Sequence, residues 1–375
     1  MNQDYFQTDL TTWEIGPYHS ALPGPMRLKL KLDGEIISSA QVETGFLHKG
    51  LEKAHELHPW QSLISYVDHL DPEAGVFGEL VLSMAVEEIF NLEVPPRAQM
   101  IRLILCELSR ISSHLLYVVR MARSVGSETI VHYVLRDREK ILDLFELLTG
   151  ARFSLNFLRY GGVRFDITEG FVERVLDTCD LIRIRIKEYN DLFTYNHSFI
   201  KRTAGISPLS KESIHLLGVT GPNARASGMS LDYRKTTYYL GYKDIEFETP
   251  LGTGAVGCLG DVHDRFIVRL KEISQSMEIL KQLINKVPSG EFYIPSQNKM
   301  DQSVFGESYK KIESPRGLLG CYVSSEGREQ PSRVQFRTPS MSHLSLIPLL
   351  IVGIKLEDLP VVIASLDLSL AEADK

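Results

Sequence analysis

The sequence has few cysteines, no long apolar run and no excess of basic residues, and each shortage excludes a class of protein. Its cysteines stand far apart, at Cys106, Cys179, Cys258 and Cys321. Their spacings are not those of a zinc site, an iron–sulfur site or a disulfide scaffold, so we expect ordinary thiols in a reducing cytosol. Lys and Arg number 41 against 48 Asp and Glu, a net charge of −7. This acidity argues against a general nucleic-acid binder.

Apolar stretches are too short to cross a bilayer. The longest, residues 344–354, has about half the length that a membrane-spanning helix needs. The first sixteen residues carry acidic side chains and no apolar core, so they do not predict a signal peptide. We expect any association with a membrane to come through partner proteins.

Apolar residues recur at helical spacing in five long segments. The pattern predicts helices over residues 76–90, from Pro95-Pro96 onward, over 132–149, over 168–193 and over 261–285. Proline suits the first turn of a helix, Gly150 is expected as a C-terminal cap, and Thr168 is expected as an N-cap. Residues 26–43 predict a β-hairpin, because alternating apolar residues flank an Asp33-Gly34 turn signal.

These segments predict an α+β fold, a helical bundle core with peripheral β-strands. We divide one compact unit into an N-terminal hairpin and pocket loop (1–75), a helical bundle core (76–200), a β/loop insertion (201–260), and a long helix with a C-terminal β/loop region (261–375). Short strands and loops are expected over 203–251 and from Tyr293 onward, where glycine and proline are frequent.

No isolated motif identifies an activity. The glycine-rich run 252–257 has neither the preceding strand nor the following Lys-Ser/Thr of a nucleotide loop. A group of histidines (His48, His55, His58 and His69) lacks the carboxylate or thiolate company typical of a metal site, so we expect no metal on this chain. Glu107, Arg110 and His114 share one helix face, which allows either a solvent-exposed ion pair or a face that meets a partner subunit.

A series of motifs runs in order along nearly the whole chain. It includes Gly16-Pro17-Tyr18-His19, Gly45-Phe46-Leu47-His48-Lys49-Gly50, Pro95-Pro96-Arg97-Ala98-Gln99-Met100-Ile101-Arg102, Glu107-Leu108-Ser109-Arg110 with His114, Arg159-Tyr160-Gly161-Gly162, Asp232-Tyr233-Arg234-Lys235, Ser314-Pro315-Arg316-Gly317 and Ile363-Ala364-Ser365-Leu366-Asp367. The series resembles the D subunit of complex I, a core component of NADH–quinone oxidoreductase related to the large subunits of nickel–iron hydrogenases. The resemblance implies a helical bundle like that of a hydrogenase large subunit.

The resemblance also implies a chain that binds no cofactor itself and works inside a respiratory complex. A small neighbouring subunit of the B type would hold a terminal 4Fe-4S cluster, and a quinone would accept electrons between the two subunits, coupled to proton or ion translocation. Other implied partners are peripheral-arm subunits of the C and I types and a membrane-arm subunit at the quinone entrance. The implied location is the cytoplasmic side of the cell inner membrane, peripheral and held through the complex.

Site residues carried over by the resemblance fall into two groups. Near the cluster, His114 matches a family histidine, His48 and Lys49 match a His-Arg pair, and His69 stands where the family usually has arginine. A lysine or histidine does not replace an arginine fork equivalently. In the quinone pocket, His19 matches the first histidine of the Gly-Pro-x-His motif.

Three quinone-pocket positions depart from the family. Pro23 stands in place of the second histidine of the motif, Pro72 in place of a tyrosine, and Ser124 in place of the aspartate that pairs with that histidine. Proline can donate neither a proton nor a hydrogen bond, so the usual headgroup chemistry is lost. The remaining candidate proton donors are His19, His69 and Asp71, together with water.

Hydrogen activation is excluded by the same resemblance. A nickel–iron centre needs four thiolates, soft ligands for soft metals. The corresponding positions hold Asp71, Ala74, Ser369 and Glu372, and none is cysteine.

Two functions of different classes follow. The first is a core subunit that helps to pass electrons from the terminal cluster to a quinone or related membrane carrier. The second is a structural or regulatory paralogue that keeps the fold and the interface but has lost carrier reduction. The full-length motif series favours the first, and the three pocket departures favour the second.

Overall fold

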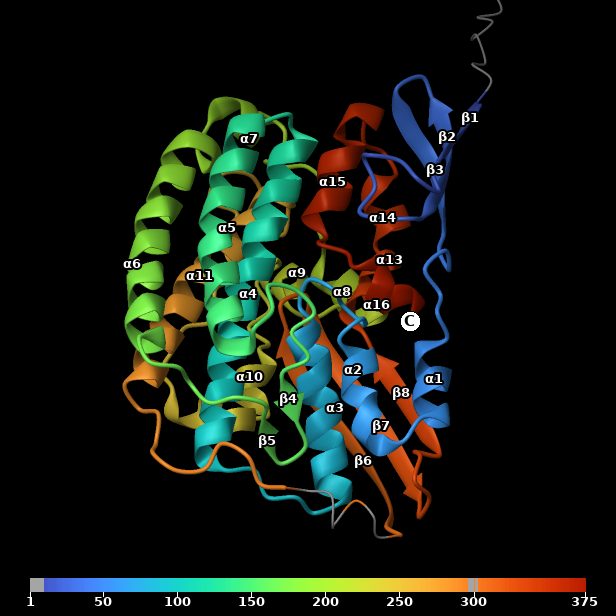
Figure 1. The fold of residues 1–375 in the computed structure, drawn as a ribbon. Coiled ribbons are helices and arrows are strands. Elements are labelled where there is room, and N and C mark those ends of the chain that lie inside the picture. Colours follow the sequence, from blue (N-terminus) through green and yellow to red (C-terminus); the bar gives the residue numbers. More distant parts are fainter. Residues whose placement is uncertain (1–9, 296–299, 301–302) are drawn as a thin grey trace, which may run out of the picture.

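Five long helices form the bulk of the molecule, as their periodicity predicts. The computed structural model describes residues 10–295, 300 and 303–375. The long helices are α3 (Gly75–Ile89), α4 (Pro96–Ser124), α5 (Glu128–Thr149), α6 (Phe171–Tyr189) and α11 (Val262–Ile284). Helix α4 packs against α3, α5 and α11, and every residue from 101 to 115 is buried (Figure 1). Three of the other long helices therefore pack around this central helix.

Helix ends follow local backbone chemistry. Pro96 begins α4 and Gly150 ends α5 with a left-handed φ of 80°, both as predicted. Helix α5 begins at Glu128, earlier than predicted. The N-cap predicted at Thr168 is wrong, because α6 begins only after Gly170, whose φ of 77° sets the entry into the helix. The predicted C-terminal part of that helix continues past Tyr189 as a π-helical turn, η2 (Asn190–Thr194).

Small antiparallel sheets complete the α+β fold. The first contains β1 (Thr11–Ile15), β2 (Arg27–Asp33) and β3 (Ile36–Glu43), so the predicted hairpin is confirmed as β2–β3. The second contains β6 (Phe305–Ser314), β7 (Gly317–Glu326) and β8 (Arg333–Arg337), as expected after Tyr293, and β6 and β7 pack against α3. A two-stranded ribbon joins β4 (Leu158–Arg159) to β5 (Gly162–Val163).

The strands predicted over 203–251 are wrong, because this segment folds into short helices. They are α8 (Lys211–Leu217), α9 (Pro222–Ala226), α10 (Tyr233–Thr236) and the 3-10 helix η3 (Tyr239–Asp244). Side-chain caps favour these helical turns: Ser210 accepts a hydrogen bond from Ser213 N at 3.2 Å, and Asp232 accepts one from Arg234 N at 3.0 Å. Such caps occupy backbone donors that a strand would have offered to a neighbour.

Further short helices connect the sheets to the bundle. They are α1 (Leu51–Leu57), η1 (Trp60–Ser62), α2 (Leu63–Val67), α7 (His197–Lys201), α13 (Pro339–Leu344), α14 (Ile347–Ile351), η4 (Leu356–Asp358), α15 (Leu359–Ser365) and α16 (Leu370–Asp374). Figure 1 places the segments near α13 to α16 between the bundle and the N-terminal sheet, so both ends of the sequence contribute to that region.

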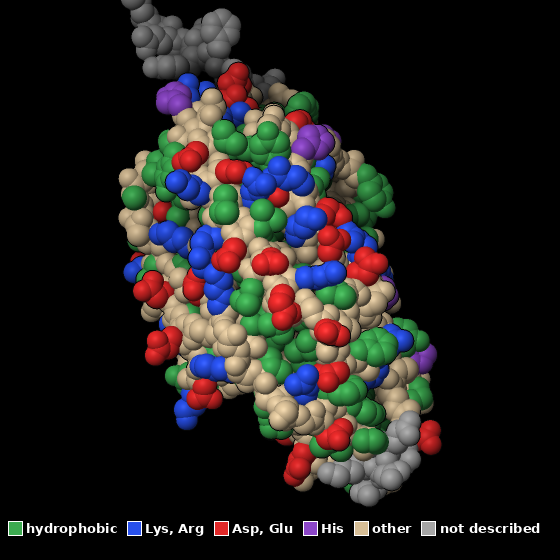
Figure 2. Space-filling model, turned by 60° about the vertical axis from the view of Figure 1, so that its left-hand side comes forward, with side chains coloured by type: hydrophobic (Ala, Val, Ile, Leu, Met, Phe, Trp, Pro, Cys, Tyr) green, Lys and Arg blue, Asp and Glu red, His purple; other side chains and the backbone are tan. Residues whose placement is uncertain are grey.

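The visible surface carries charges of both signs. Figure 2 shows acidic and basic side chains interspersed over the face turned forward, rather than separated into patches. Several pair on α6 and α11, such as Lys281 with Asp180 at 2.7 Å and Arg183 with Glu278 at 2.7 Å. Among the helices of the described residues, none is both long and apolar enough to cross a bilayer.

The start of α11 offers a test of the fold. Asp261 is buried and accepts backbone hydrogen bonds from Asp264, Gly205 and Cys258 at 2.7–2.9 Å. Asp261→Ala leaves these donors without partners, so we expect the free energy of unfolding to fall by about 2–4 kcal/mol. Denaturant unfolding of the full chain measures this, with the exposed Asp177→Ala on α6 as control. Equal stabilities of the two variants would contradict the assignment.

Candidate functional site

A cavity of about 520 Å³ opens between the loop before β2, the end of α4 and helix α15. Its walls are largely apolar and small, and include Leu22, Pro23 and Ala364. Arg120 and Arg123 supply the charge. Three segments that are distant in sequence therefore build a pocket with apolar walls and guanidinium donors.

Arg120 connects this cavity to the interior. One of its nitrogens donates to Oδ1 of Asp367 at 2.5 Å, and another pairs with Glu73. Glu73 in turn lines a small cleft of about 20 Å³ together with Pro72 and Asp68. The Arg120–Glu73 ion pair thus joins the walls of the two spaces.

Arg316, in the turn between β6 and β7, lies behind this ion pair. It is wholly buried, pairs with Asp71 and Glu73, and donates from Nε to the backbone oxygen of Asp367 at 2.9 Å. Burial raises the pKa of the Asp71 carboxyl in spite of the nearby Arg316 charge. Burial and the charge of Asp71 together raise the pKa of Glu372 to about 8. Glu372, which holds a proton near neutral pH, and Asp71, whose pKa is raised, therefore lie behind the Arg120–Glu73 pair.

Two segments of the backbone, one at Gly221 and the other at Arg316 and Gly317, cross at contact distance. A Cβ added to Gly221 would lie 2.4 Å from the backbone oxygen of Arg316, and one added to Gly317 would lie 2.6 Å from Oγ1 of Thr220. Both glycines have positive φ, 72° and 142°. Only glycine suits these positions, and the crossing fixes the base of the site.

A second buried network surrounds His114 on α4. Its Nε2 lies 3.0 Å from Oε2 of Glu272, whose other oxygen accepts from Arg225 Nε at 2.8 Å. Arg225 also pairs with Glu313 at 2.7 Å. Burial lowers the pKa of His114, whereas the pKa of Glu272 is lowered despite its burial by the charge of Arg225 and the His114 bond.

The network continues along the same helix face. Glu107 and Arg110 pair at 3.3 Å, and neither side chain is exposed. Both readings offered by the sequence, a solvent-exposed pair or a face that meets a partner, are therefore wrong for this face of α4. The face is instead packed inside the chain.

The positions expected in the quinone pocket are brought together only in part. Pro23 and Ser124 line the 520 Å³ cavity, while Pro72 lines the small cleft beyond the Arg120–Glu73 pair. His19 is exposed beside Ser20 at the cavity wall, and its Nδ1 accepts from Ala21 N at 3.2 Å.

The positions expected near the cluster are scattered. His69 and Lys49 are exposed, and His48 is exposed with Nδ1 2.7 Å from the backbone oxygen of Asp374. His114 is wholly buried, so it has no surface that could touch a group held by another chain. That these four residues lie near the cluster stays a prediction. Because His114 is buried, it could influence the cluster only through other residues.

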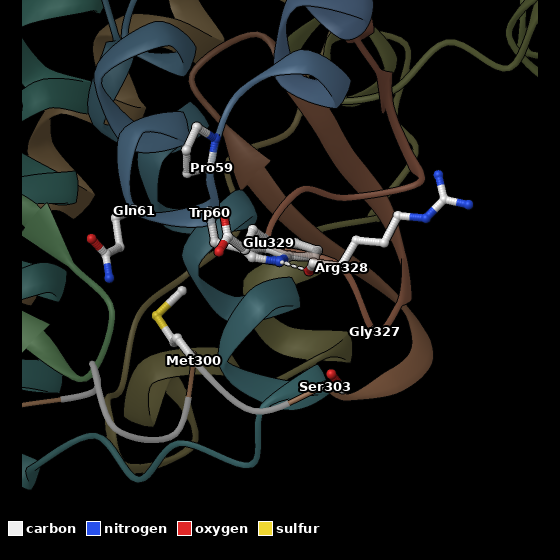
Figure 3. Close-up of a pocket in the computed structure, with 8 residues that line it drawn as sticks. All are labelled: Pro59, Trp60, Gln61, Met300, Ser303, Gly327, Arg328 and Glu329. Carbon is white, nitrogen blue, oxygen red and sulfur yellow. Dashed lines mark hydrogen bonds between the residues drawn. The ribbon is translucent and has the colours of Figure 1, made fainter.

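A separate cavity of about 440 Å³ lies near η1 and the β7–β8 connection. Figure 3 shows Trp60 beside it, with Nε1 donating to the backbone oxygen of Arg328 at 3.1 Å, while the Arg328 guanidinium points away. None of the predicted site residues lines this cavity.

Comparison with known proteins identifies the family. A family model described as "Respiratory-chain NADH dehydrogenase, 49 Kd subunit" matches residues 124–304 and 296–375. The chain belongs to the D-subunit family of complex I. It is 41% identical over 362 residues to the D subunit of the NADH-quinone oxidoreductase of Desulforamulus reducens, covering 96% of this chain and 97% of that protein.

Other members of this family match over similar lengths. The D subunit numbered 1 of the NADH-quinone oxidoreductase of Opitutus terrae is 37% identical over 395 aligned residues, 99% of this chain and 92% of that protein. The corresponding D subunit of Bacillus mycoides is 34% identical over 368 residues, 98% of this chain and 99% of that protein. The relatives are named as subunits of an enzyme complex, and the match is close to full length.

The hydrogenase-type metal positions of this chain do not fit a metal centre. Asp71 and Glu372 carry oxygen ligands only, Ser369 and Ala74 offer no thiolate, and Arg316 places a cation against Asp71. In the described part of the chain, no three or more His, Cys, Asp or Glu side chains are arranged to hold a metal ion.

Sequence reasoning missed the residues that connect the site. The sequence does not indicate that Arg120 and Glu73 form an ion pair or that Glu372 is buried. The one available signal was the i, i+4 spacing of Arg120 and Ser124, which places both on one face of α4.

The buried network predicts a large effect of removing one partner. Arg225→Met leaves Glu272 and Glu313 buried without their shared cation, so we expect a loss of about 3–5 kcal/mol in the free energy of unfolding. Denaturant unfolding of the full chain measures it. Adding Glu313→Gln should restore part of the loss, and Arg123→Met, at an exposed arginine, should change little. A cost for Arg225→Met as small as that of the control would contradict the network.

Glu79 on α3 predicts a pH dependence of stability. Burial and the charge of Asp68 raise the pKa of Glu79 to about 8, although its Oε2 accepts from Phe157 N and Leu158 N at 2.9 and 2.8 Å. A raised pKa means that the folded chain holds this proton more tightly than the unfolded chain. The stability from Glu79 is therefore present below its unfolded pKa of 4.5 and is lost as pH rises through about 8.

Glu79→Gln should reduce this loss. We expect a smaller fall in Tm than in the wild type between about pH 6 and about pH 9, since glutamine resembles the protonated acid but does not titrate. Glu88→Gln is the control, because Lys310 and Ser308 lower the pKa of Glu88 out of this range. An unchanged slope in Glu79→Gln would show that Glu79 is ionised.

Proposed function

We propose that this chain is a peripheral-arm core subunit of a complex I-type respiratory oxidoreductase, and that its 520 Å³ cavity receives the headgroup of a quinone or related membrane carrier. The electrons would come from a 4Fe-4S cluster held by a small neighbouring subunit of the B type. Subunits of the C and I types and a membrane-arm subunit would hold the chain peripherally at the cytoplasmic side of the inner membrane. Ion translocation would be coupled to this electron transfer in the membrane arm.

One observation carries this proposal. Pro23 and Ser124, which the resemblance assigns to the headgroup pocket, come from distant segments and line the same cavity with Arg120. The volume of about 520 Å³ lies within the range of small-molecule pockets, about 300–1,000 Å³. Apolar walls suit a ring, and guanidinium N–H groups suit its oxygens.

The arginines supply hydrogen bonds but no protons. A guanidinium stays charged in proteins, so Arg120 and Arg123 can stabilise a negatively charged reduced ring without protonating it. Reduction of a quinone also requires protons. Candidate sources are His19 beside the cavity wall, Asp71 behind the Arg120–Glu73 pair, and water, whereas His69 lines neither the cavity nor the cleft.

A structural or regulatory subunit is the second candidate. It is favoured by the absence of the usual donors at Pro23, Pro72 and Ser124, and by the Arg120–Glu73 ion pair, which lies where the two spaces meet. The two candidates differ in one result. A wild-type complex whose terminal cluster is reduced but which reduces no carrier would favour this second function.

Filling the cavity tests the first candidate. Ala364→Phe adds a ring to the wall formed by α15, so we expect reduction of quinone analogues by the purified complex to fall by about tenfold or more. The terminal cluster should still be reduced by the upstream donor, which its electron paramagnetic resonance signal reports. Ala54→Phe on α1, outside the cavity, is the matched control. Wild-type turnover in Ala364→Phe would place the carrier elsewhere.

A further inference from the structure

Arg316 faces more carboxylates than one guanidinium can neutralise. It pairs with Asp71 and Glu73, and its Nη2 lies 3.9 Å from Oδ1 of Asp367. Glu372 is buried and faces both Arg316 and Asp71. Four carboxyl groups therefore surround one cation.

Neighbouring charges do not remove this excess. Arg120 is bound to Glu73 and Asp367, which leaves no bond from it to the other two carboxyls. The remaining charged or titratable groups that face Glu73 or Asp367 from adjacent elements are Arg138, Arg269, His114, His343 and Tyr117. Burial raises the pKa of Tyr117 to about 12, so it stays neutral. Burial lowers the pKa of both histidines, that of His343 to about 3, so neither adds a positive charge at neutral pH.

Two serines hold Asp71 and Glu372 beside each other. The backbone N–H of Ser340 donates to Oε1 of Glu372 at 3.0 Å, and the side chain of Ser369 bonds to Asp71. The serines are themselves joined, because Ser369 N donates to Oγ of Ser340 at 3.0 Å. Both carboxyls are buried, and ionising both at neutral pH is opposed by their mutual repulsion, as in other carboxyl dyads.

We propose that Asp71 and Glu372 share one proton, and that this proton is delivered to the carrier when it is reduced in the cavity. The delivery rests on the function proposed above, whereas the sharing of the proton does not. Glu73 connects the two places: its carboxylate binds Arg316 next to Asp71 and also binds Arg120 at the cavity wall.

The reaction balances with the partner's cluster as electron donor. A quinone takes up two electrons, one at a time, as the cluster is oxidised, and two protons convert it to the quinol. The shared proton passes from Asp71 through the ionised Glu73 carboxylate to one ring oxygen. The second proton comes from bulk solvent through water at the cavity mouth, and the pair regains its proton from solvent, so the cycle takes up two solvent protons for each quinol. The pair thus takes over a task that Pro23 and Pro72 cannot perform.

Infrared spectroscopy of the complex without carrier tests the sharing. The wild-type minus Glu372→Gln difference spectrum, in which carboxyl groups outside the pair such as Glu79 cancel, should contain the C=O stretch of one protonated carboxyl group at pH 7. This band, identified by its shift in heavy water, should disappear as the pH rises through about 8. The wild-type minus Asp71→Asn difference spectrum should contain the same band, because in either variant the remaining carboxyl no longer faces its partner's charge and ionises beside Arg316. Glu326→Gln, at an exposed carboxylate, should leave the band unchanged. A difference spectrum of either pair variant that lacks this band would overturn the sharing.

Steady-state kinetics with quinone analogues test the delivery. Wild-type carrier reduction should decline above about pH 8, and Glu372→Gln should slow it by about 10²-fold or more, the usual contribution of a positioned proton donor. Glu372→Asp, which keeps an ionisable group, should restore part of the rate. A wild-type rate and pH profile in Glu372→Gln would overturn the delivery even if the band is lost. Absence of turnover in the wild type would overturn the proposed function and the delivery, while the infrared result would still decide the sharing.

Discussion

Burial of arginine is the constraint on which the interior of this protein depends. Seven of its largest fully buried side chains are arginines: Arg102, Arg110, Arg225, Arg234, Arg265, Arg269 and Arg316. A buried guanidinium is tolerated only where carboxylates and carbonyls surround it, and breaking such a pair costs several times more than a surface pair contributes. Each arginine therefore dictates which segments must meet. Arg225, for example, joins α9 to α11 through Glu272 and to β6 through Glu313.

The same constraint brings the candidate site together. Arg316 comes from the turn between β6 and β7, Asp71 from the loop before α3, and Asp367 from the connection between α15 and α16. The cavity lies at the outer edge of this charged base, where the side chains of Arg120 and Glu73 are partly exposed. A charge that forms in the cavity therefore acts on the buried ion pairs of the core through Arg120.

Periodicity in the sequence was sufficient for the long helices and the first hairpin. It failed over 203–251, because glycine and proline suggest loops and strands while caps such as Ser210 and Asp232 stabilise short helical turns. For the site, the family resemblance identified Pro23 and Ser124 as neighbours in one pocket, which their spacing alone could not do. The Arg120–Glu73 pair could not be predicted, since ion pairing between distant segments has no periodic signal.

The crossing of Gly221 and Gly317 divides the site into a part that can vary and a part that cannot. At that crossing two segments of the main chain touch, so a side chain of any size at Gly221 would push Arg316 away from its carboxylates. The walls of the cavity and of the small cleft carry no such restriction. Pro23 and Ser124, in the cavity wall, stand on a loop and at a helix end, and Pro72, in the cleft, stands before a helix. Substitution can therefore reshape what the pocket accepts without disturbing the charges beneath it. A relative that uses a different membrane carrier would therefore be expected to differ from this chain at those wall residues.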